Sequence, residues 1–191
     1  MKIIFAFLLS LSSVAFSTPN SIIAIVNDTV ITMDSISAKI NKKTTVKQKI
    51  ALVQQQIDIA LQKEKIQTLG ITLKADAVNK VLDNVAKQNG LTIAQLRSNN
   101  QFEQIVATVT QNLTLNGLEK MVLQQANITL TQAEIDETLA NNPKKSAVTA
   151  MVHLANIKAQ LIRVKQIAFF QGWIKSLRKD AYIEIFTDKL K

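Results

Sequence analysis

The 191-residue sequence contains no cysteine, a single histidine, only four glycines and two prolines. Without cysteine, the chain cannot form a disulfide, a thiolate metal site or a lipid-modified cysteine. With His153 as its one histidine, it has no pair of histidines for a metal site or a proton relay. The glycines stand singly and form no phosphate-binding loop, and no serine lies in a nucleophile-elbow context. We therefore expect no cofactor, no metal and no catalytic centre.

Long apolar runs are also scarce, and the one present lies at the N-terminus. The segment MKIIFAFLLSLSSVAFS, residues 1–17, places Lys2 before a run of apolar and small residues. This pattern is typical of a secretory signal peptide, and the run is shorter than the roughly 18 to 20 residues that a membrane-spanning helix needs. We expect cleavage after Ser17, with retention as an uncleaved anchor as the alternative.

The charge is strongly positive, with a formal net charge of +9. Removal of residues 1–17 takes away Lys2 and leaves 22 basic against 14 acidic residues, a net charge of +8. Nucleic acid is not the expected partner of these basic residues, because the signal peptide indicates that the protein is exported. Two interpretations remain, a solvated polar surface or attraction to anionic lipid head groups or acidic polypeptides. The densest basic stretch contains Lys39, Lys42, Lys43, Lys47 and Lys49.

A small hairpin is predicted directly after the signal peptide. β-branched residues fill 22–26 and 30–32, on either side of Asn27-Asp28, a pair that tolerates the positive φ of a two-residue turn. Thr32 is placed to cap a helix that begins at Met33, and the lysine-rich segment 41–45 reads as a loop.

The middle of the chain predicts helices. Apolar residues recur at helical spacing, and Gly70 and Gly90 are placed to end two of the helices. Thr92-x-x-Gln95 and Thr131-x-x-Glu134 are capping boxes, each flanked by a hydrophobic pair. They predict two further helix starts, the second of these helices ending before Pro143. The long helices are expected at residues 46–69, 74–89 and 101–125.

The last part of the chain predicts a helix and a closing strand. Residues 147–157 fit either a strand or a helix, and we favour a helix because a lone strand would lack a neighbouring partner. A further helix ends near residues 179–180, and the β-rich run 182–186 follows. We expect this strand to pair with the hairpin. The predicted fold is mainly α, a multi-helix core with a small antiparallel sheet.

Three segments resemble the SurA-type periplasmic chaperones. They are IAIVNDTVIT (23–32), VLDNVAKQNGLTIAQLRS (81–98) and FFQGWIKSLRKDAYIEIF (169–186). The resemblance covers nearly all of residues 22–142 and again 165–186. It implies a single chaperone core domain over residues 18–191, located in the periplasm. That domain would consist of an N-terminal part (18–142), a joining segment (143–164) and a C-terminal helix and strand (165–191).

In that family, parvulin-type peptidyl-prolyl isomerase domains interrupt the core. Here the joining segment has about 20 residues, well below the roughly 50 that the smallest ordinary domain needs. VHLANI, residues 152–157, resembles the first strand of a parvulin domain, but the rest of that domain is missing. The resemblance therefore implies a chaperone that is not an enzyme, and His153 is expected on a helix rather than in a catalytic site.

The function implied is binding of unfolded outer-membrane β-barrel proteins through an apolar groove. A scaffold for one dedicated periplasmic partner and a degenerate isomerase remain as alternatives, and the sequence leaves open whether the chain forms a homodimer. Flexible methionines and aromatic residues suit a groove for varied partners, although each is also a natural core residue. The candidate groove residues are Met33, Phe102, Val106, Met121, Met151, Phe169, Phe170 and Trp173.

Overall fold

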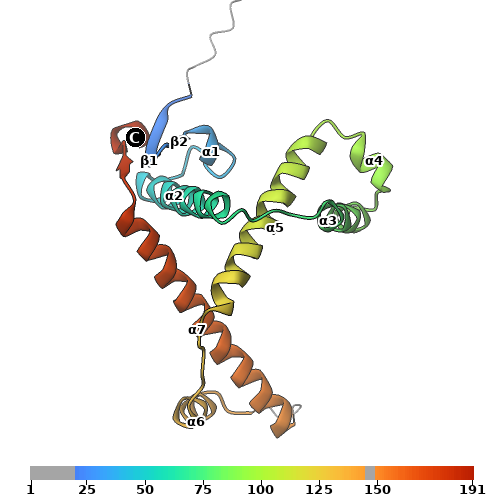
Figure 1. Cartoon of the computed structure of the whole chain (residues 1–191), viewed down its shortest axis with the longest axis vertical. Coiled ribbons are helices and arrows are strands. Elements are labelled where there is room, and N and C mark those ends of the chain that lie inside the picture. Colours follow the sequence, from blue (N-terminus) through green and yellow to red (C-terminus); the bar gives the residue numbers. More distant parts are fainter. Residues whose placement is uncertain (1–19, 145–148) are drawn as a thin grey trace, which may run out of the picture.

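The computed structural model describes residues 20–144 and 149–191, so the predicted signal peptide lies outside the described residues. Figure 1 shows an open arrangement in which helices extend as arms from the small sheet and the long helix α7. The elements in chain order are β1 (Ile22–Val26), β2 (Thr29–Thr32), α1 (Asp34–Ser37), α2 (Val46–Thr68), α3 (Ala75–Gln88), α4 (Ile93–Arg97), α5 (Phe102–Gln124), α6 (Gln132–Asn141), α7 (Ala150–Asp180), β3 (Ile183–Ile185) and the 3-10 helix η1 (Thr187–Leu190).

The two ends of the described chain meet in one antiparallel sheet with the strand order β2-β1-β3. The tight turn between β1 and β2 places Asn27 at a φ of 48°. The Asn27 backbone N–H donates to the Tyr182 carbonyl (2.9 Å), and the Tyr182 N–H donates to Asn27 Oδ1 (2.9 Å). The predicted hairpin, its third strand and the mainly α fold class are confirmed.

The predicted cap of the first helix is wrong. Helix α1 is a single turn, and Met33, the residue at the N-cap position before it, has helical backbone angles and forms no side-chain cap. The Thr32 hydroxyl instead accepts a hydrogen bond from the Asn20 side-chain amide (2.8 Å). Asn20 Oδ1 in turn accepts the Asp34 backbone N–H (3.0 Å). The cap is therefore supplied by a residue that lies before β1 in the sequence.

The other helix boundaries follow the local signals closely. Thr92 and Thr131 both form the predicted capping boxes, and α3 and α5 each end within one residue of their expected limits. Gly70 and Gly90, with φ of 61° and 67°, follow the ends of α2 and α3. Thr45 and Gln48 form a third capping box, at the start of α2, that the sequence reading missed.

Helix α7 shows that residues 150–157 of the ambiguous segment are helical, while residues 147 and 148 lie outside the described residues. It begins after Thr149, whose hydroxyl accepts the Val152 backbone N–H (3.3 Å), and it runs for 31 residues. At 1.5 Å per residue it is about 46 Å long. The helix continues without a break from the joining segment into the C-terminal part, so the VHLANI sequence is helical. Figure 1 shows α7 passing from α6 at one end of the molecule to the sheet.

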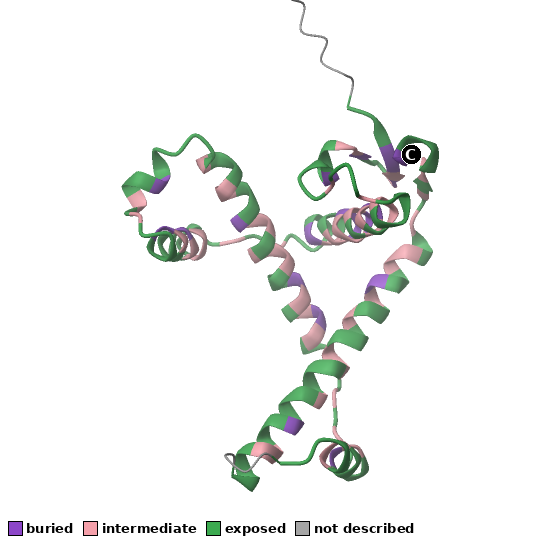
Figure 2. Cartoon of the chain, turned by 180° about the vertical axis from the view of Figure 1, so that it is seen from behind, coloured by how far each residue is buried: buried purple, intermediate pink, exposed green. Residues whose placement is uncertain are grey.

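Most buried apolar residues in the described part of the chain form three separate clusters rather than one core, and Ile135, Ile157 and Ile174 are buried outside these clusters (Figure 2). We name the three clusters the sheet cluster (the sheet, α1, α2 and η1), the arm cluster (α3, α4 and α5) and the junction cluster (α2, α5 and α7). Their fully or nearly buried members are Ile23, Ala24, Val26, Ile31, Ile36, Val53, Ile57, Ala60, Leu61 and Leu190 in the sheet cluster; Leu82, Ala86, Leu96 and Val109 in the arm cluster; and Ile66, Leu118 and Val122 in the junction cluster.

A polar contact fixes α7 against α2. Arg178 Nε donates to Asp58 Oδ1 (2.6 Å), while its two terminal nitrogens donate to the Gln54 side-chain oxygen (2.6 Å) and backbone carbonyl (2.8 Å). The planar guanidinium group suits this forked arrangement. The contact joins residues 120 positions apart and holds the end of α7 where β3 can reach β1.

The buried Leu190 side chain predicts that the C-terminal turn contributes to stability. Leu190 is 0% exposed although it is the penultimate residue. We expect Leu190→Ala to lower the free energy of unfolding by about 2 to 5 kcal/mol, as for other buried leucines. Lys191→Ala, which alters the exposed neighbour, is the control and should change the free energy of unfolding little. Urea unfolding followed by circular dichroism measures both, and equal stability of the two variants would contradict the prediction.

Candidate functional site

The structure distributes the eight predicted groove residues among several places. Met121, Phe170 and Trp173 lie together at the edge of the junction cluster, where the two aromatic rings stack with centroids 5.4 Å apart. Phe102 and Val106 pack against the arm cluster, and Met33 packs against the sheet cluster. Met151 and Phe169 are exposed on α7, Met151 at 82%. The structure thus brings three of the eight together.

An open groove lies between α3 and α5. It has a volume of about 730 Å³, within the usual range for ligand sites. We call it the α3–α5 groove. Its apolar floor consists of Val81, Val85, Ile105, Val109 and Leu113, and its polar rim of Gln101, Gln104, Thr108, Asn112 and Asn116.

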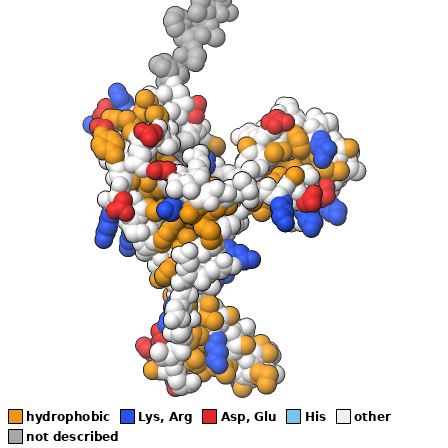
Figure 3. Space-filling model, viewed as in Figure 1, with side chains coloured by type: hydrophobic (Ala, Val, Ile, Leu, Met, Phe, Trp, Pro, Cys, Tyr) orange, Lys and Arg blue, Asp and Glu red, His pale blue; other side chains and the backbone are white. Residues whose placement is uncertain are grey.

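The groove exists because a short helical turn reverses the chain between its two walls. The Thr92 capping box starts α4, and buried Leu96 on α4 joins Leu82 and Ala86 of α3 in the arm cluster beneath the groove. α5 packs against α3 on its return. Figure 3 shows hydrophobic side chains gathered on this arm and also around the junction of α2, α5 and α7.

The residues that line the groove include no charged side chain. The floor can accept apolar side chains, and four of the five rim residues carry amide groups that both donate and accept hydrogen bonds. A peptide backbone offers the same donors and acceptors. The arrangement is therefore chemically suited to an extended polypeptide with apolar side chains.

The sequence contains a signal for this groove that the search for methionine and aromatic residues overlooked. On α5 two neighbouring rows run with four-residue spacing, one apolar and one polar, so they lie side by side on the helix. The apolar row is Ile105, Val109 and Leu113, and the polar row is Gln104, Thr108, Asn112 and Asn116.

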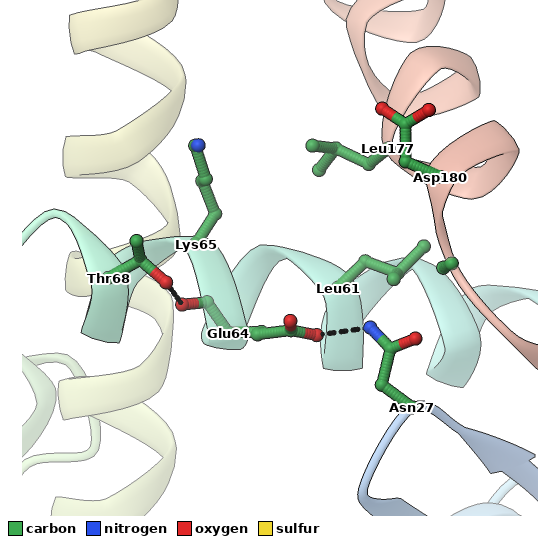
Figure 4. A pocket seen from close by; sticks show the side chains of 8 residues that line it. Asn27, Leu61, Glu64, Lys65, Thr68, Leu177 and Asp180 are labelled. Atoms are coloured by element: carbon green, nitrogen blue, oxygen red, sulfur yellow. Dashed lines mark hydrogen bonds between the residues drawn. The ribbon is translucent and has the colours of Figure 1, made fainter.

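A second, smaller cavity of about 220 Å³ lies between α2, α7 and the hairpin turn (Figure 4). Asn27 Nδ2 donates to Glu64 Oε2 across 2.7 Å, and the Thr68 hydroxyl donates to the Glu64 carbonyl. Lys65 and Asp180 line the same space. These contacts tie the turn of the hairpin to α2, and the cavity is too small for a polypeptide segment.

Neither a metal site nor a catalytic arrangement is found in the part of the chain that the structure describes. Among these residues there is no cluster of three His, Asp or Glu side chains that could hold a metal ion. His153 lies on α7 with Nε2 2.8 Å from the Asn142 carbonyl oxygen. The described residues that line the pocket beside it, which include Asn156 and Gln160, carry no carboxylate and no hydroxyl. Within residues 20–144 and 149–191, no helix has the length and apolarity to cross a membrane.

An ion pair holds α6 against α7. Lys165 Nζ lies 2.7 Å from Glu134 Oε1 and donates to the Thr129 carbonyl oxygen (2.7 Å). Glu134 also accepts hydrogen bonds from the Thr131 backbone and hydroxyl in the capping box. The Lys165 ammonium group, together with these Thr131 hydrogen bonds, lowers the pKa of Glu134 to about 2. The Glu134 carboxylate therefore caps the N-terminus of α6 and also holds α6 against α7.

Comparisons with known proteins agree on one class. No protein-family model matches the chain. A segment of 104 residues is 30% identical to the Chaperone SurA of Nitrosococcus oceani, covering 52% of this chain and 24% of that protein. The Chaperone SurA of Legionella pneumophila (strain Paris) is 25% identical over 154 residues, covering 72% of this chain and 36% of that protein. The chain thus spans between a quarter and just over a third of the curated relatives it matches.

The fold is also similar to that of a solved structure. A solved structure from a study of PEB4 and the periplasmic protein Cj1289, two structurally related SurA-like chaperones of Campylobacter jejuni, matches with a TM-score of 0.64. The match covers 87% of this chain and 99% of that one at 13% identity, so it concerns the fold alone. The resemblance to SurA-type chaperones is confirmed in sequence and in fold.

The depressed pKa of Glu134 predicts an acid-sensitive α6. A lowered pKa in the folded state stabilises the fold above the unfolded value of 4.5, and this contribution is lost as the pH falls toward about 2. We expect hydrogen-exchange protection of α6 to fall across this range, after correction for intrinsic rates. Glu134→Gln should abolish that pH dependence, whereas Glu137→Gln, on the same helix, should retain it. Unchanged pH dependence in Glu134→Gln would contradict the assignment.

Proposed function

We propose that this chain acts in the periplasm as a chaperone that binds unfolded outer-membrane β-barrel proteins in the α3–α5 groove. The similarity to proteins named as SurA chaperones supports the class of function. The predicted signal peptide supports export. The observation that carries the choice of site is the uncharged groove with an apolar floor and an amide rim.

The spacing of the floor matches an extended client. Residues four apart on α5, such as Ile105, Val109 and Leu113, rise by about 6 Å per step along the helix. In an extended chain, side chains on the same face repeat every two residues, about 6.6 Å apart. Successive apolar side chains of a client strand can therefore lie against successive floor residues.

β-barrel precursors have this pattern. Their strands alternate apolar and polar residues over segments of about ten residues. An apolar face laid on the floor turns the polar side chains outward and brings the client backbone near the rim amides. Recognition then depends on alternation and not on a particular sequence, which is the selectivity that a chaperone for many barrels needs.

The affinity expected of such a site is modest. Each apolar side chain buried contributes roughly 25 cal/mol/Å², and ordering the flexible client offsets much of this gain. We therefore expect dissociation constants in the micromolar range, which correspond to a binding free energy on the order of −8 kcal/mol. Binding of this strength suppresses aggregation and still permits release.

A scaffold for one dedicated partner is the main alternative. A scaffold would recognise one sequence, so unrelated barrel proteins would not compete for its surface. The absence of charge in the groove favours the chaperone, because specific protein partners are usually selected with complementary charges.

Polar substitution of the groove floor tests the site. We expect Val85→Asn with Ile105→Asn to weaken binding of unfolded barrel proteins at least about tenfold, since it removes apolar area from both walls. The matched control is Val164→Asn on α7, a valine that is 56% exposed and lies outside the groove. Fluorescence anisotropy with two unrelated barrel proteins and light scattering provide the measurements.

The two barrel proteins should compete with each other for the unaltered chain. Circular dichroism confirms that the groove variant is folded before its binding is compared. If the folded groove variant binds both clients as tightly as the Val164→Asn control, the α3–α5 groove is not the site. If the unaltered chain leaves client scattering unchanged, the chaperone function itself fails.

A proline-turnover assay tests the isomerase alternative. We expect the rate of cis–trans isomerisation of a proline peptide to equal that of buffer, since His153 lies among amides on the surface of α7. An acceleration that disappears in His153→Ala would show that the chain is an isomerase.

A further inference from the structure

One strongly charged segment plays no part in the proposed client site. Five lysines occupy the loop between α1 and α2 and the first turn of α2, and no acidic residue occurs from position 35 to position 57. We name this segment the lysine patch. It consists of Lys39, Lys42, Lys43, Lys47 and Lys49.

These ammonium groups have no partner among the residues that the structure describes. The ion pairs found in residues 20–144 and 149–191 join Lys165 to Glu134, Arg178 to Asp58 and Lys189 to Asp188. No side-chain hydrogen bond of the five lysines is present in the same part of the chain, and all are exposed except Lys49, which is half-buried. The positive charge of the patch therefore faces solvent.

The position of two of the lysines is unfavourable for the helix itself. Lys47 and Lys49 lie in and next to the first turn of α2, which contains no acidic residue. The N-terminus of a helix carries partial positive charge and favours acidic side chains. Local stability of α2 therefore does not explain these lysines, whereas an external anion would offset the repulsion.

We propose that the lysine patch binds the anionic surface of a lipid bilayer. Clustered lysines are attracted to anionic lipids in a roughly additive way. Val46, 39% exposed between Thr45 and Lys47, adds an apolar side chain that can enter the head-group region beside the lysine stems.

The chemistry of the patch favours lipid over other polyanions. It has no arginine, the residue suited to forked recognition of single phosphates or carboxylates. Residues 38–50 contain no aromatic side chain on which a nucleic-acid base could stack. A diffuse set of lysines around one exposed valine fits a broad, fluid anionic surface.

Binding at the lysine patch would leave the client site open. Figure 1 shows α1 and the start of α2 beside the sheet, whereas α3 and α4 lie on a separate arm across α5. The chain could therefore rest on a membrane surface with the α3–α5 groove accessible. This inference is independent of the client that the groove receives.

The experiment is co-sedimentation of the purified chain with vesicles of phosphatidylcholine, with and without phosphatidylglycerol. We expect binding only to the anionic vesicles and a steep loss of binding with added salt. Replacing the five lysines of the patch by glutamine should lower the partition coefficient at least about tenfold. The control replaces five other exposed lysines and so removes the same charge: Lys80, Lys87, Lys120, Lys158 and Lys175.

Three outcomes would overturn the proposal. If both five-lysine variants lose vesicle binding equally, the binding depends on net charge and not on the lysine patch. If the unaltered chain binds neutral vesicles as well as anionic vesicles, the site is not electrostatic. Competition by polyglutamate as effective as that by anionic vesicles would assign the patch to acidic polypeptides. Client binding by the patch variant is measured in parallel, so failure at the membrane is distinguished from failure of the chaperone function.

Discussion

The central position of strand β1 is the constraint on which the rest of the fold depends. A two-stranded hairpin is marginal alone, so the β1–β2 hairpin needs the third strand that α7 delivers from the other end of the chain. The forked contact of Arg178 with Asp58 and Gln54 aligns α7 for this pairing. Leu190 then closes the sheet cluster from beyond β3. The sequence between β2 and β3 is thus one long connection whose ends are fixed.

Because the sheet holds the two ends of the described chain together, the residues between β2 and β3 do not have to form one compact core. The arm cluster and the junction cluster are each small, and each is built by three helices. Packed helices in such arms keep one face toward solvent, which is why half-buried apolar residues such as Val81 and Ile105 border an open groove. Openness of this kind costs stability, because less apolar area is buried per residue, but it provides binding surface.

Apart from the pairing of β3 with the hairpin, the parts of the fold that the sequence predicted are those set by local chemistry. The Thr92 and Thr131 capping boxes act across three residues, and the glycines after α2 and α3 act through their own φ. The Thr32 cap failed because a distant residue, Asn20, took its place. The eight predicted groove residues are dispersed over the structure for a related reason. Hydrophobicity identifies which residues are buried, but not which of three clusters each residue joins.

The composition of the groove changes the physical basis expected for client tolerance. Flexible methionines were the natural expectation, yet four of the five floor residues are valine or isoleucine, whose side chains are stiff at χ1. A stiff floor is formed before the client arrives and loses little side-chain entropy on binding. Under the proposed function, different client sequences can then bind as long as their alternating apolar side chains match the helical repeat of α5. The amide rim, which can pair with a backbone common to all sequences, is compatible with that form of recognition.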